Sequence, residues 1–252
     1  MRCLTAASAR GGAGDPVSYG DPAPHGASGS GDATEVEEHV PWTQRHVPDG
    51  SAEQAAKGMF EMMRCRRSVR HFSDRPVSRE TMEWLVRCGT TAPSGANKQP
   101  WRFVCIQDAE TKKAIRAAAE EEEREFYGRR ASDRWLKDLK PFGTNPVKEF
   151  LEVAPWVVVL FKLMKEDDGS QVYYVNESVG LAAGMFLTAC NAAGLATLTH
   201  TPSPMGFLSK VLGRPDHERP FLLIPVGYPA AEVLVPKHAL ERKPLDQVMG
   251  VK

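Results

Sequence analysis

Four arginines, Arg64, Arg66, Arg67 and Arg70, stand within the short stretch RCRRSVRHF. Guanidinium groups match phosphate oxygens bidentately, so a cluster of this density is typical of a site that holds a phosphorylated ligand. The same arginines could instead cover the solvated end of a helix. The segment by itself leaves the phosphate site and the plain helix end both open.

An acidic run, EEEEREFYGRR at residues 120–130, contains a single tyrosine. Glu123 and Tyr127 are four positions apart, so a helix would place both side chains on one face. Both side chains could then point into a binding site. The alternative is that the run is the solvated face of a surface helix, as we expect for residues 120–122 in either case.

Small and hydroxyl-bearing residues form a turn with the sequence TTAPSGANKQPW at residues 90–101. Because Gly95 carries no side chain, the backbone N–H groups of such a turn can approach a flat ligand closely. The stretch ERKPLDQ near the end of the sequence adds Arg242 as a further cation. Both features favour a ligand site built on turns.

Other kinds of chemistry lack their signatures in this sequence. It contains no H-E-x-x-H, G-x-S-x-G, Walker or Rossmann glycine motif, which argues against the common hydrolytic and nucleotide-binding sites. The seven histidines lie far apart in the sequence, so no metal site is expected. With 32 basic and 32 acidic residues the formal net charge is zero, which argues against a nucleic-acid partner.

The composition is that of an ordinary globular protein, with 42% hydrophobic and 25% charged residues among 252. No apolar stretch approaches the roughly 18 residues of a membrane span, so none is expected. The five cysteines are odd in number and scattered, without a C-x-x-C pair. They are therefore expected to be reduced thiols of a cytoplasmic protein.

Residues 1–50 are expected to be mostly a tail without a core. Residues 1–32 are rich in Gly, Ala, Ser and Pro and predict disorder, because they offer too little apolar surface to offset the entropy of folding. Residues 34–50 predict an extended arm with Trp42 as a possible anchor. Arginines without an acid before Asp15 leave a transit peptide as an alternative.

Residues 51–252 alternate between helical and strand patterns and predict one layered domain of sheet and helices. Helices are expected at 52–65, 79–88, 109–130, 147–153 and 176–194. Strands are expected at 101–108, 156–162, 195–199 and 221–227. Ser78 and Asp108 are expected to cap helices, and Asn145 with Pro146 to open another. The helix at 176–194 is apolar nearly all round and is expected to be buried.

The motifs RRSVRHF, APSGANKQPW, LTHTP, PVGYP and RKPLDQ, in this order, resemble the flavin-dependent nitroreductase superfamily. The acidic run together with DRWLKDLK and TNPVKEFLEVAP resembles, more narrowly, the iodotyrosine deiodinases. The resemblance runs from about residue 38 to the C-terminus. It implies an α+β, nitroreductase-like fold with a central mixed β-sheet flanked by helices, an intertwined homodimer, and a lid around residues 120–148.

The resemblance implies FMN as the cofactor. The residues that would hold it are Arg66, Arg67, Ser68, Val69, Arg70, Pro93, Ser94, Gly95, Thr199, His200, Thr201 and Arg242. The hydroxyl of Thr201 is the candidate for a hydrogen bond to flavin N5 and so for a catalytic role. His200 stands where a small hydroxyl residue is more usual in the family, and it could either tune the flavin or pack beside it.

The resemblance also implies how a substrate would be held. The backbone N–H of Ala96 would face the phenolate oxygen of a halotyrosine. Glu123 would pair with its ammonium and Lys148 with its carboxylate. Tyr127 would donate a hydrogen bond and cover the ring.

The implied reaction is reductive dehalogenation of a halotyrosine to tyrosine and halide, with iodotyrosine first and bromo- or chlorotyrosine as further candidates. The electron donor would be NAD(P)H or an unidentified reductase. The membrane anchor of vertebrate relatives is missing, which implies a soluble form. Two alternatives remain: a broad-specificity NAD(P)H-dependent nitroreductase or other flavin reductase, and a non-catalytic binder of flavin or halotyrosine.

Overall fold

The computed structural model describes residues 42, 43 and 45–252. The expected disordered tail and transit peptide therefore lie outside the described residues. The chain divides into two compact units, Met1–Gly58 and Met59–Lys252. Helix α1 (Ala52–Met63) contains the junction between the units, and everything that follows concerns the second unit.

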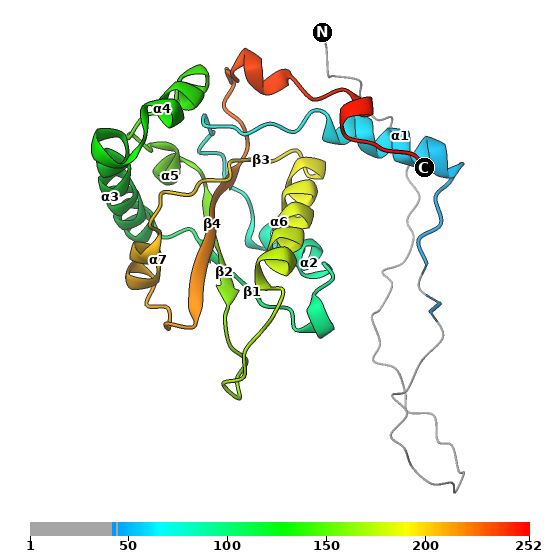
Figure 1. Ribbon diagram of the computed structural model, residues 1–252, viewed down its shortest axis with the longest axis horizontal. Coiled ribbons are helices and arrows are strands. Elements are labelled where there is room, and N and C mark those ends of the chain that lie inside the picture. Colours follow the sequence, from blue (N-terminus) through cyan, green and yellow to red (C-terminus); the bar gives the residue numbers. More distant parts are fainter. Residues whose placement is uncertain (1–41, 44) are drawn as a thin grey trace, which may run out of the picture. The chain divides into compact units, whose positions relative to one another are not determined.

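A four-stranded sheet runs through the second unit in the order β1-β2-β4-β3 (Figure 1). Its strands are β1 (Trp101–Ile106), β2 (Trp156–Leu163), β3 (Ala196–Thr197) and β4 (Glu218–Gly227). All neighbouring strands pair antiparallel, and the register of β2 on β4 shifts between Leu160 and Phe161. The expectation of a mixed sheet was therefore wrong for these strands, and the parallel pairing of Ser68 with Thr197 is an isolated bridge outside them.

Strand β2 lies at the centre of the core because both of its faces are apolar. Its sequence WVVVLFKL is rich in β-branched residues, and residues 157–161 are fully buried. Successive side chains point to opposite faces of a strand. Val157 and Val159 accordingly belong to one buried cluster, and Trp156 and Val158 belong to another.

Helices cover the two faces of the sheet, as Figure 1 shows. The face of Val157 packs against α3 (Ala109–Glu125), α5 (Phe150–Val153) and α7 (Gly206–Val211). The face of Val158 packs against α2 (Arg79–Thr90) and α6 (Val175–Ala192). This arrangement confirms the α+β fold class.

The remaining elements are short and lie in the connections. They are η1 (Gly95–Asn97), η2 (Phe126–Arg130), α4 (Asp133–Leu139), η3 (Lys140–Phe142), η4 (Lys237–Leu240) and η5 (Leu245–Gln247). Cys88, Cys105 and Cys190 are free thiols, as expected for these three. Among the described residues no helix is both long and apolar enough to cross a bilayer.

The helix starts predicted from capping residues are confirmed for α2 and α3. The hydroxyl of Ser78 accepts a hydrogen bond from the Thr81 N–H at 3.1 Å, and the Asp108 carboxylate accepts one from Thr111 N–H at 2.7 Å. Helix α3 was expected to continue to residue 130. It ends instead at Glu125 and passes into η2, a single π-helical turn.

Two further expectations about helices were wrong. The helix expected at 147–153 begins only at Phe150, and the backbone N–H of Lys148 before it donates to the Glu120 side chain of α3. Helix α6 was expected to be buried all round. It leaves Leu181 50% and Met185 38% exposed.

Candidate functional site

An open cavity of about 1090 Å³ lies between the end of α3 and the segment that follows β3. Residues from five parts of the chain form its walls: 70–71, 122–130, 135–150, 198–204 and 234–236. Two of these parts contain the residues expected to grip an amino acid. The others contain Arg70, the Thr199–Thr201 stretch and a C-terminal segment.

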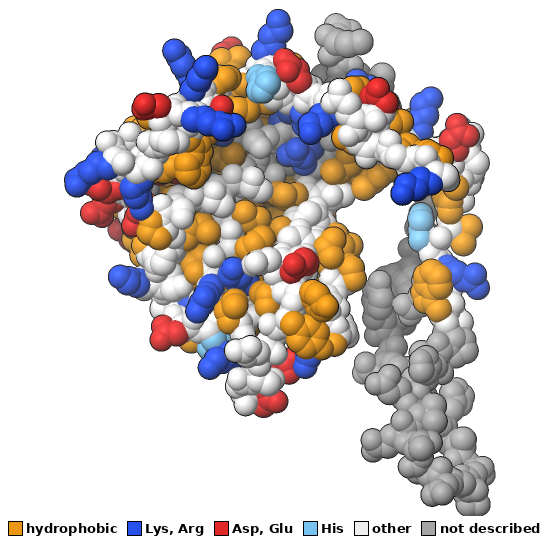
Figure 2. Space-filling view, viewed as in Figure 1, with side chains coloured by type: hydrophobic (Ala, Val, Ile, Leu, Met, Phe, Trp, Pro, Cys, Tyr) orange, Lys and Arg blue, Asp and Glu red, His pale blue; other side chains and the backbone are white. Residues whose placement is uncertain are grey.

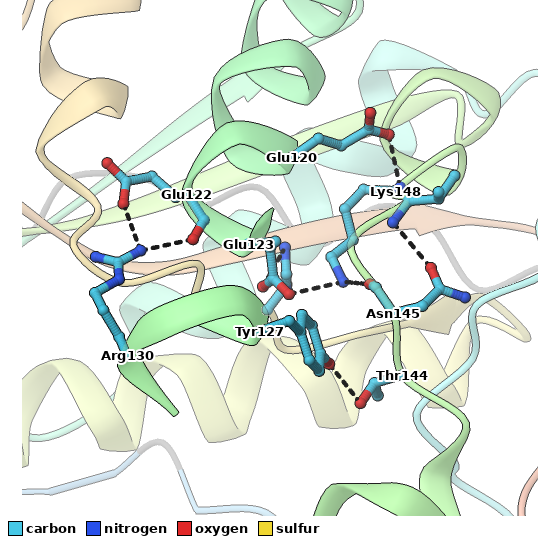
Figure 3. A network of polar contacts seen from close by, with 10 residues as sticks. Glu120, Glu122, Glu123, Tyr127, Arg130, Thr144, Asn145 and Lys148 are labelled. Carbon is cyan, nitrogen blue, oxygen red and sulfur yellow. Dashed lines mark hydrogen bonds and ion pairs between the residues drawn. The ribbon is translucent and has the colours of Figure 1, made fainter. Parts of the chain in front are cut away.

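Glu123 and Lys148 form a buried ion pair in the wall of this cavity (Figure 3). Lys148 Nζ lies 3.0 Å from Glu123 Oε2, and the two side chains are only 6% and 11% exposed. Lys148 Nζ also donates to the backbone carbonyl of Asn145. Burial lowers the pKa of Lys148, and the adjacent Glu123 carboxylate opposes that shift. Each buried charge is thus neutralised by the other.

Tyr127 completes this group from the π-helical turn. Its hydroxyl donates to Thr144 Oγ1 at 2.7 Å, and its ring centroid lies 5.9 Å from Lys148 Nζ. Burial raises the pKa of Tyr127, so the phenol stays protonated at neutral pH. Glu123, Tyr127 and Lys148 therefore converge from two segments (Figure 3).

The glutamates before Glu123 are not all the solvated face that was expected. Glu120 Oε1 accepts hydrogen bonds from Lys148 N–H at 2.8 Å and from Arg116 Nε at 2.7 Å. Glu122 accepts from Arg130 Nη2 through both its carboxylate and its backbone carbonyl, at 2.7 and 2.6 Å (Figure 3). Only Glu121 of the three is exposed. Glu120 holds the Lys148 segment against α3, and Arg130 braces the π-helical turn.

His200 lies on the wall of the cavity beside this group. Its backbone exchanges hydrogen bonds with Leu223 at 2.9 and 3.0 Å. Its ring meets Phe150 edge to face at 5.7 Å between centroids. Its Nε2 is buried without a hydrogen-bond partner and lies 3.8 Å from Glu123 Oε1. Burial, followed by the charges of Lys148 and Arg70, lowers its pKa to about 3, so the imidazole is neutral at ordinary pH.

The arginines of the first cluster are close enough to repel one another. Burial lowers the pKa of Arg66, and the nearby positive charges of Arg242 and Arg67 lower it further. Arg67 Nη1 donates to the carbonyls of Arg64 and Arg66 at 2.7 and 2.6 Å, whereas its Nε is buried without a partner. A buried guanidinium N–H among mutually repelling cations suits an anion such as a phosphate. Burial also lowers the pKa of Arg70.

The turn at residues 93–96 lies elsewhere, against the start of α6. The Gly95 N–H faces Ser178 Oγ at 3.5 Å, and a side chain at Gly95 would come within 2.7 Å of the Tyr174 ring. Ala96 has a left-handed backbone with φ of 47°. This turn therefore combines close packing with a strained backbone.

The expected site residues thus fall into two sets. Those that line the cavity are Arg70, Glu123, Tyr127, Lys148, Thr199, His200 and Thr201. Those outside its walls are Arg66, Arg67, Ser68, Val69, Pro93, Ser94, Gly95, Ala96 and Arg242. The sequence interpretation assigned no role to the wall residues Thr144 and Phe150, although both lie in the motif TNPVKEFLEVAP. It also missed the anchor Glu120, which nothing in the acidic run distinguishes from its neighbours.

Comparison with known proteins matches residues 63–228 to the family model described as the nitroreductase family. Iodotyrosine deiodinase of Haliscomenobacter hydrossis is 53% identical over 196 residues, which are 76% of this chain and 87% of that protein. Human iodotyrosine deiodinase 1 is 42% identical over 217 residues, covering 84% and 74% of the two chains.

A solved structure of oxidised iodotyrosine deiodinase bound to FMN and 3-iodo-L-tyrosine resembles this chain with a TM-score of 0.64 and 30% identity. The match covers 74% of this chain and 95% of that one. A nitroreductase-like protein of Streptococcus mutans, at 16% identity and a TM-score of 0.58, shares the fold over 79% of this chain and 99% of its own.

Proposed function

Because the chain belongs to the nitroreductase family and, within it, to the iodotyrosine deiodinases, we propose that it catalyses FMN-dependent reductive deiodination of iodotyrosine. The observation that carries this proposal is the convergence of Glu123, Tyr127 and Lys148 in one cavity. A general nitroreductase has no need for a buried pair of opposite charges there. An amino-acid zwitterion does use one.

The ion pair explains how a zwitterion enters without leaving a buried charge unpaired. Lys148 and Glu123 neutralise each other at 3.0 Å. An entering amino acid offers its carboxylate to Lys148 and its ammonium to Glu123, so each buried charge exchanges one partner for another. Tyr127 lines the same cavity, with its hydroxyl hydrogen-bonded to Thr144. A ligand with only one charge leaves one member of the pair uncompensated.

The arginines fit the FMN that the family uses. Arg66, Arg67 and Arg242 form a group of cations in which a buried Arg67 Nε–H lacks a partner, and they would bind the phosphate. Arg70 and Thr201 lie in the cavity wall, where Arg70 would meet the polar edge of the flavin ring and the Thr201 hydroxyl would bind N5. Ser68, Val69, Pro93, Ser94, Gly95 and Thr199 complete the proposed FMN contacts. His200, expected from the sequence to contact FMN, instead has its side chain against Phe150 and Glu123.

FMN, when bound and reduced, would supply the two electrons of the reaction. Iodotyrosine, two electrons and one proton give tyrosine and iodide, so the carbon–iodine bond is replaced by a carbon–hydrogen bond. The chain's own residues orient the substrate, and the backbone N–H of Ala96 is proposed to bind its phenolate. Because Glu123, Tyr127 and Lys148 grip the amino-acid part, bromo- and chlorotyrosine are proposed as further substrates. NAD(P)H or a separate reductase is the proposed electron donor.

We also propose that the site is completed in a homodimer. Ala96 and the turn around it lie outside the cavity walls of their own chain, so a second copy could bring them to the substrate. The exposed apolar residues Leu181 and Met185 on α6 and Trp84 on α2 offer a surface for that copy. Figure 2 shows hydrophobic side chains gathered over the region of these two helices.

The test is an anaerobic turnover of the FMN-loaded protein after reduction with dithionite. Iodotyrosine should reoxidise the flavin with release of one tyrosine for each FMN. Lys148→Ala should weaken iodotyrosine binding about 30-fold or more, because it leaves Glu123 buried without a partner. Lys113→Ala, which removes an exposed lysine of α3, should behave as wild type.

Two results would favour the alternatives. Reoxidation by nitrophenol, without tyrosine release from iodotyrosine and without dependence on Lys148, would make the protein a general nitroreductase. Tight binding of iodotyrosine with no reoxidation of the flavin would make it a binder.

A further inference from the structure

His200 is oriented toward the substrate clamp by the strand geometry around it. The backbone hydrogen bonds to Leu223 hold this part of the chain extended, and side chains of an extended chain alternate between two faces. Burial follows that alternation, since Thr199 and Thr201 are exposed whereas Leu198 and the His200 side chain are not. The two threonines can therefore face a cofactor while His200 faces α3 and Phe150.

The charged groups around His200 leave one clear partner for its Nε2. Glu123 Oε2 is bound to Lys148, and Glu123 Oε1 lies 3.8 Å from His200 Nε2. That separation is too long for a hydrogen bond, and Nε2 is buried with no other partner. Arg70 and Lys148 are the nearby cations. A small movement of the Glu123 carboxylate would bring its free oxygen onto the imidazole.

We propose that His200 is a positioning and specificity-determining residue that holds the Glu123 carboxylate in place for the ammonium of a bound amino acid. When a substrate carboxylate draws Lys148 away, Glu123 Oε2 becomes free for the substrate ammonium. Oε1 then accepts a hydrogen bond from His200 Nε2–H. This assignment rests on the proposed function, because it requires an amino-acid ligand in the cavity.

A neutral imidazole suits this position better than a cation. With its pKa lowered to about 3, His200 offers an N–H donor and no positive charge. A second cation beside Glu123 would compete with the ammonium for the same carboxylate. A histidine that only filled space against Phe150 would leave its buried Nε2 unsatisfied in every state, which is unfavourable.

The experiment measures ligand binding to the oxidised, FMN-loaded protein by calorimetry. The ligands are 3-iodotyrosine and its deamino analogue, 3-(4-hydroxy-3-iodophenyl)propionate. His200→Leu removes the donor at similar volume, and His200→Gln keeps an amide donor at the same distance from the backbone. We expect His200→Leu to weaken the binding of iodotyrosine about ten- to a hundredfold, with little effect on the binding of the analogue. His200→Gln should recover most of the loss.

A double-mutant cycle with Glu123→Gln tests whether His200 acts through Glu123. In the Glu123→Gln protein, His200→Leu should reduce the affinity for iodotyrosine only slightly. The proposal is overturned if His200→Leu weakens the binding of both ligands equally, or if it weakens the binding of neither. It is also overturned if the effects of the two substitutions on affinity are additive. It is also overturned if His200→Leu loses FMN, as measured by flavin absorbance, since the residue would then act through the cofactor.

Turnover is measured separately, so that a failure of the proposed function is distinguishable. A wild type that binds iodotyrosine but releases no iodide after reduction would refute the deiodinase reaction. The binding cycle would still decide the role of His200. A wild type that does not bind iodotyrosine would refute both.

Discussion

The polar residues proposed to bind the substrate are buried, and burying a polar group is unfavourable for folding. Glu123, Lys148 and His200 are polar groups withdrawn from water. The first two compensate each other, whereas His200 Nε2 is buried without a hydrogen-bond partner. A buried, unpartnered imidazole must stay neutral, which makes the folding of the chain sensitive to acid.

The pH dependence of stability should show this effect. The unfolded chain protonates His200 near its ordinary pKa of 6.5, whereas the folded protein does so only near 3. The unfolded state therefore binds more protons between these values, and acidification through this window should lower the free energy of unfolding. This one group should contribute up to about 1.4 kcal/mol per pH unit.

Urea unfolding of wild type and His200→Gln at several pH values measures the contribution. The variant lacks the titrating group, so its stability should fall less steeply below pH 6.5. Above pH 7 the free energy of unfolding should depend on pH in the same way for both proteins. Equal slopes throughout would show that His200 is accessible to protons in the folded protein.

At the scale of elements, the proposed lid would depend on a contact between α3 and the segment before α5. Glu120 receives the backbone N–H of Lys148, and Arg116 holds Glu120 in place from one turn earlier. Tyr127 binds Thr144 of the same segment. These contacts fix Lys148 beside Glu123, so a residue that never touches the substrate helps to position one that does.

Glu120→Ala should therefore weaken iodotyrosine binding by about tenfold, the loss expected for one charge-assisted hydrogen bond. Limited proteolysis around residues 143–149 should become faster, because that segment loses its anchor. Glu121→Ala, on the exposed face of the same helix, is the matched control. If the two variants behave alike, the anchoring role of Glu120 is wrong.

The elements themselves were largely predictable from the sequence. The apolar run of β2 and the caps Ser78 and Asp108 are local signals, and the structure confirms them. The role of Glu120 was not predictable, because its partner lies 28 residues away and EEEE offers no way to tell one glutamate from the next. The late start of α5 at Phe150 was likewise not predicted.

Among the site residues, too, some features follow from local sequence and others depend on distant contacts. Glu123 and Tyr127 could be paired from their spacing, whereas the orientation of His200 depends on its pairing with Leu223, which no local pattern encodes. The function was accessible from the sequence through a family resemblance. The family of the chain now rests on the comparisons with known proteins, and the roles of the individual residues remain proposals.

For the whole molecule, the proposed homodimer uses the exposed face of α6 as its interface. Leu181→Glu places a charge on that face and should convert a dimer to monomers, with loss of FMN, because each site would lose the residues of the second copy. Sedimentation velocity and flavin absorbance measure the two effects. Val153→Glu alters an exposed apolar residue on α5 and should leave the assembly unchanged. A Leu181→Glu protein that stays dimeric would exclude this surface.

The self-neutralising pair of Glu123 and Lys148 also bears on where a substrate can come from. A tyrosine inside a polypeptide has neutral amides in place of its ammonium and carboxylate. Such a residue would separate the two buried charges and satisfy neither of them. Iodinated proteins should therefore be inert toward this enzyme until proteolysis releases the modified tyrosine as a free amino acid. The chain would then act downstream of protein breakdown, as a salvage step for halogenated residues.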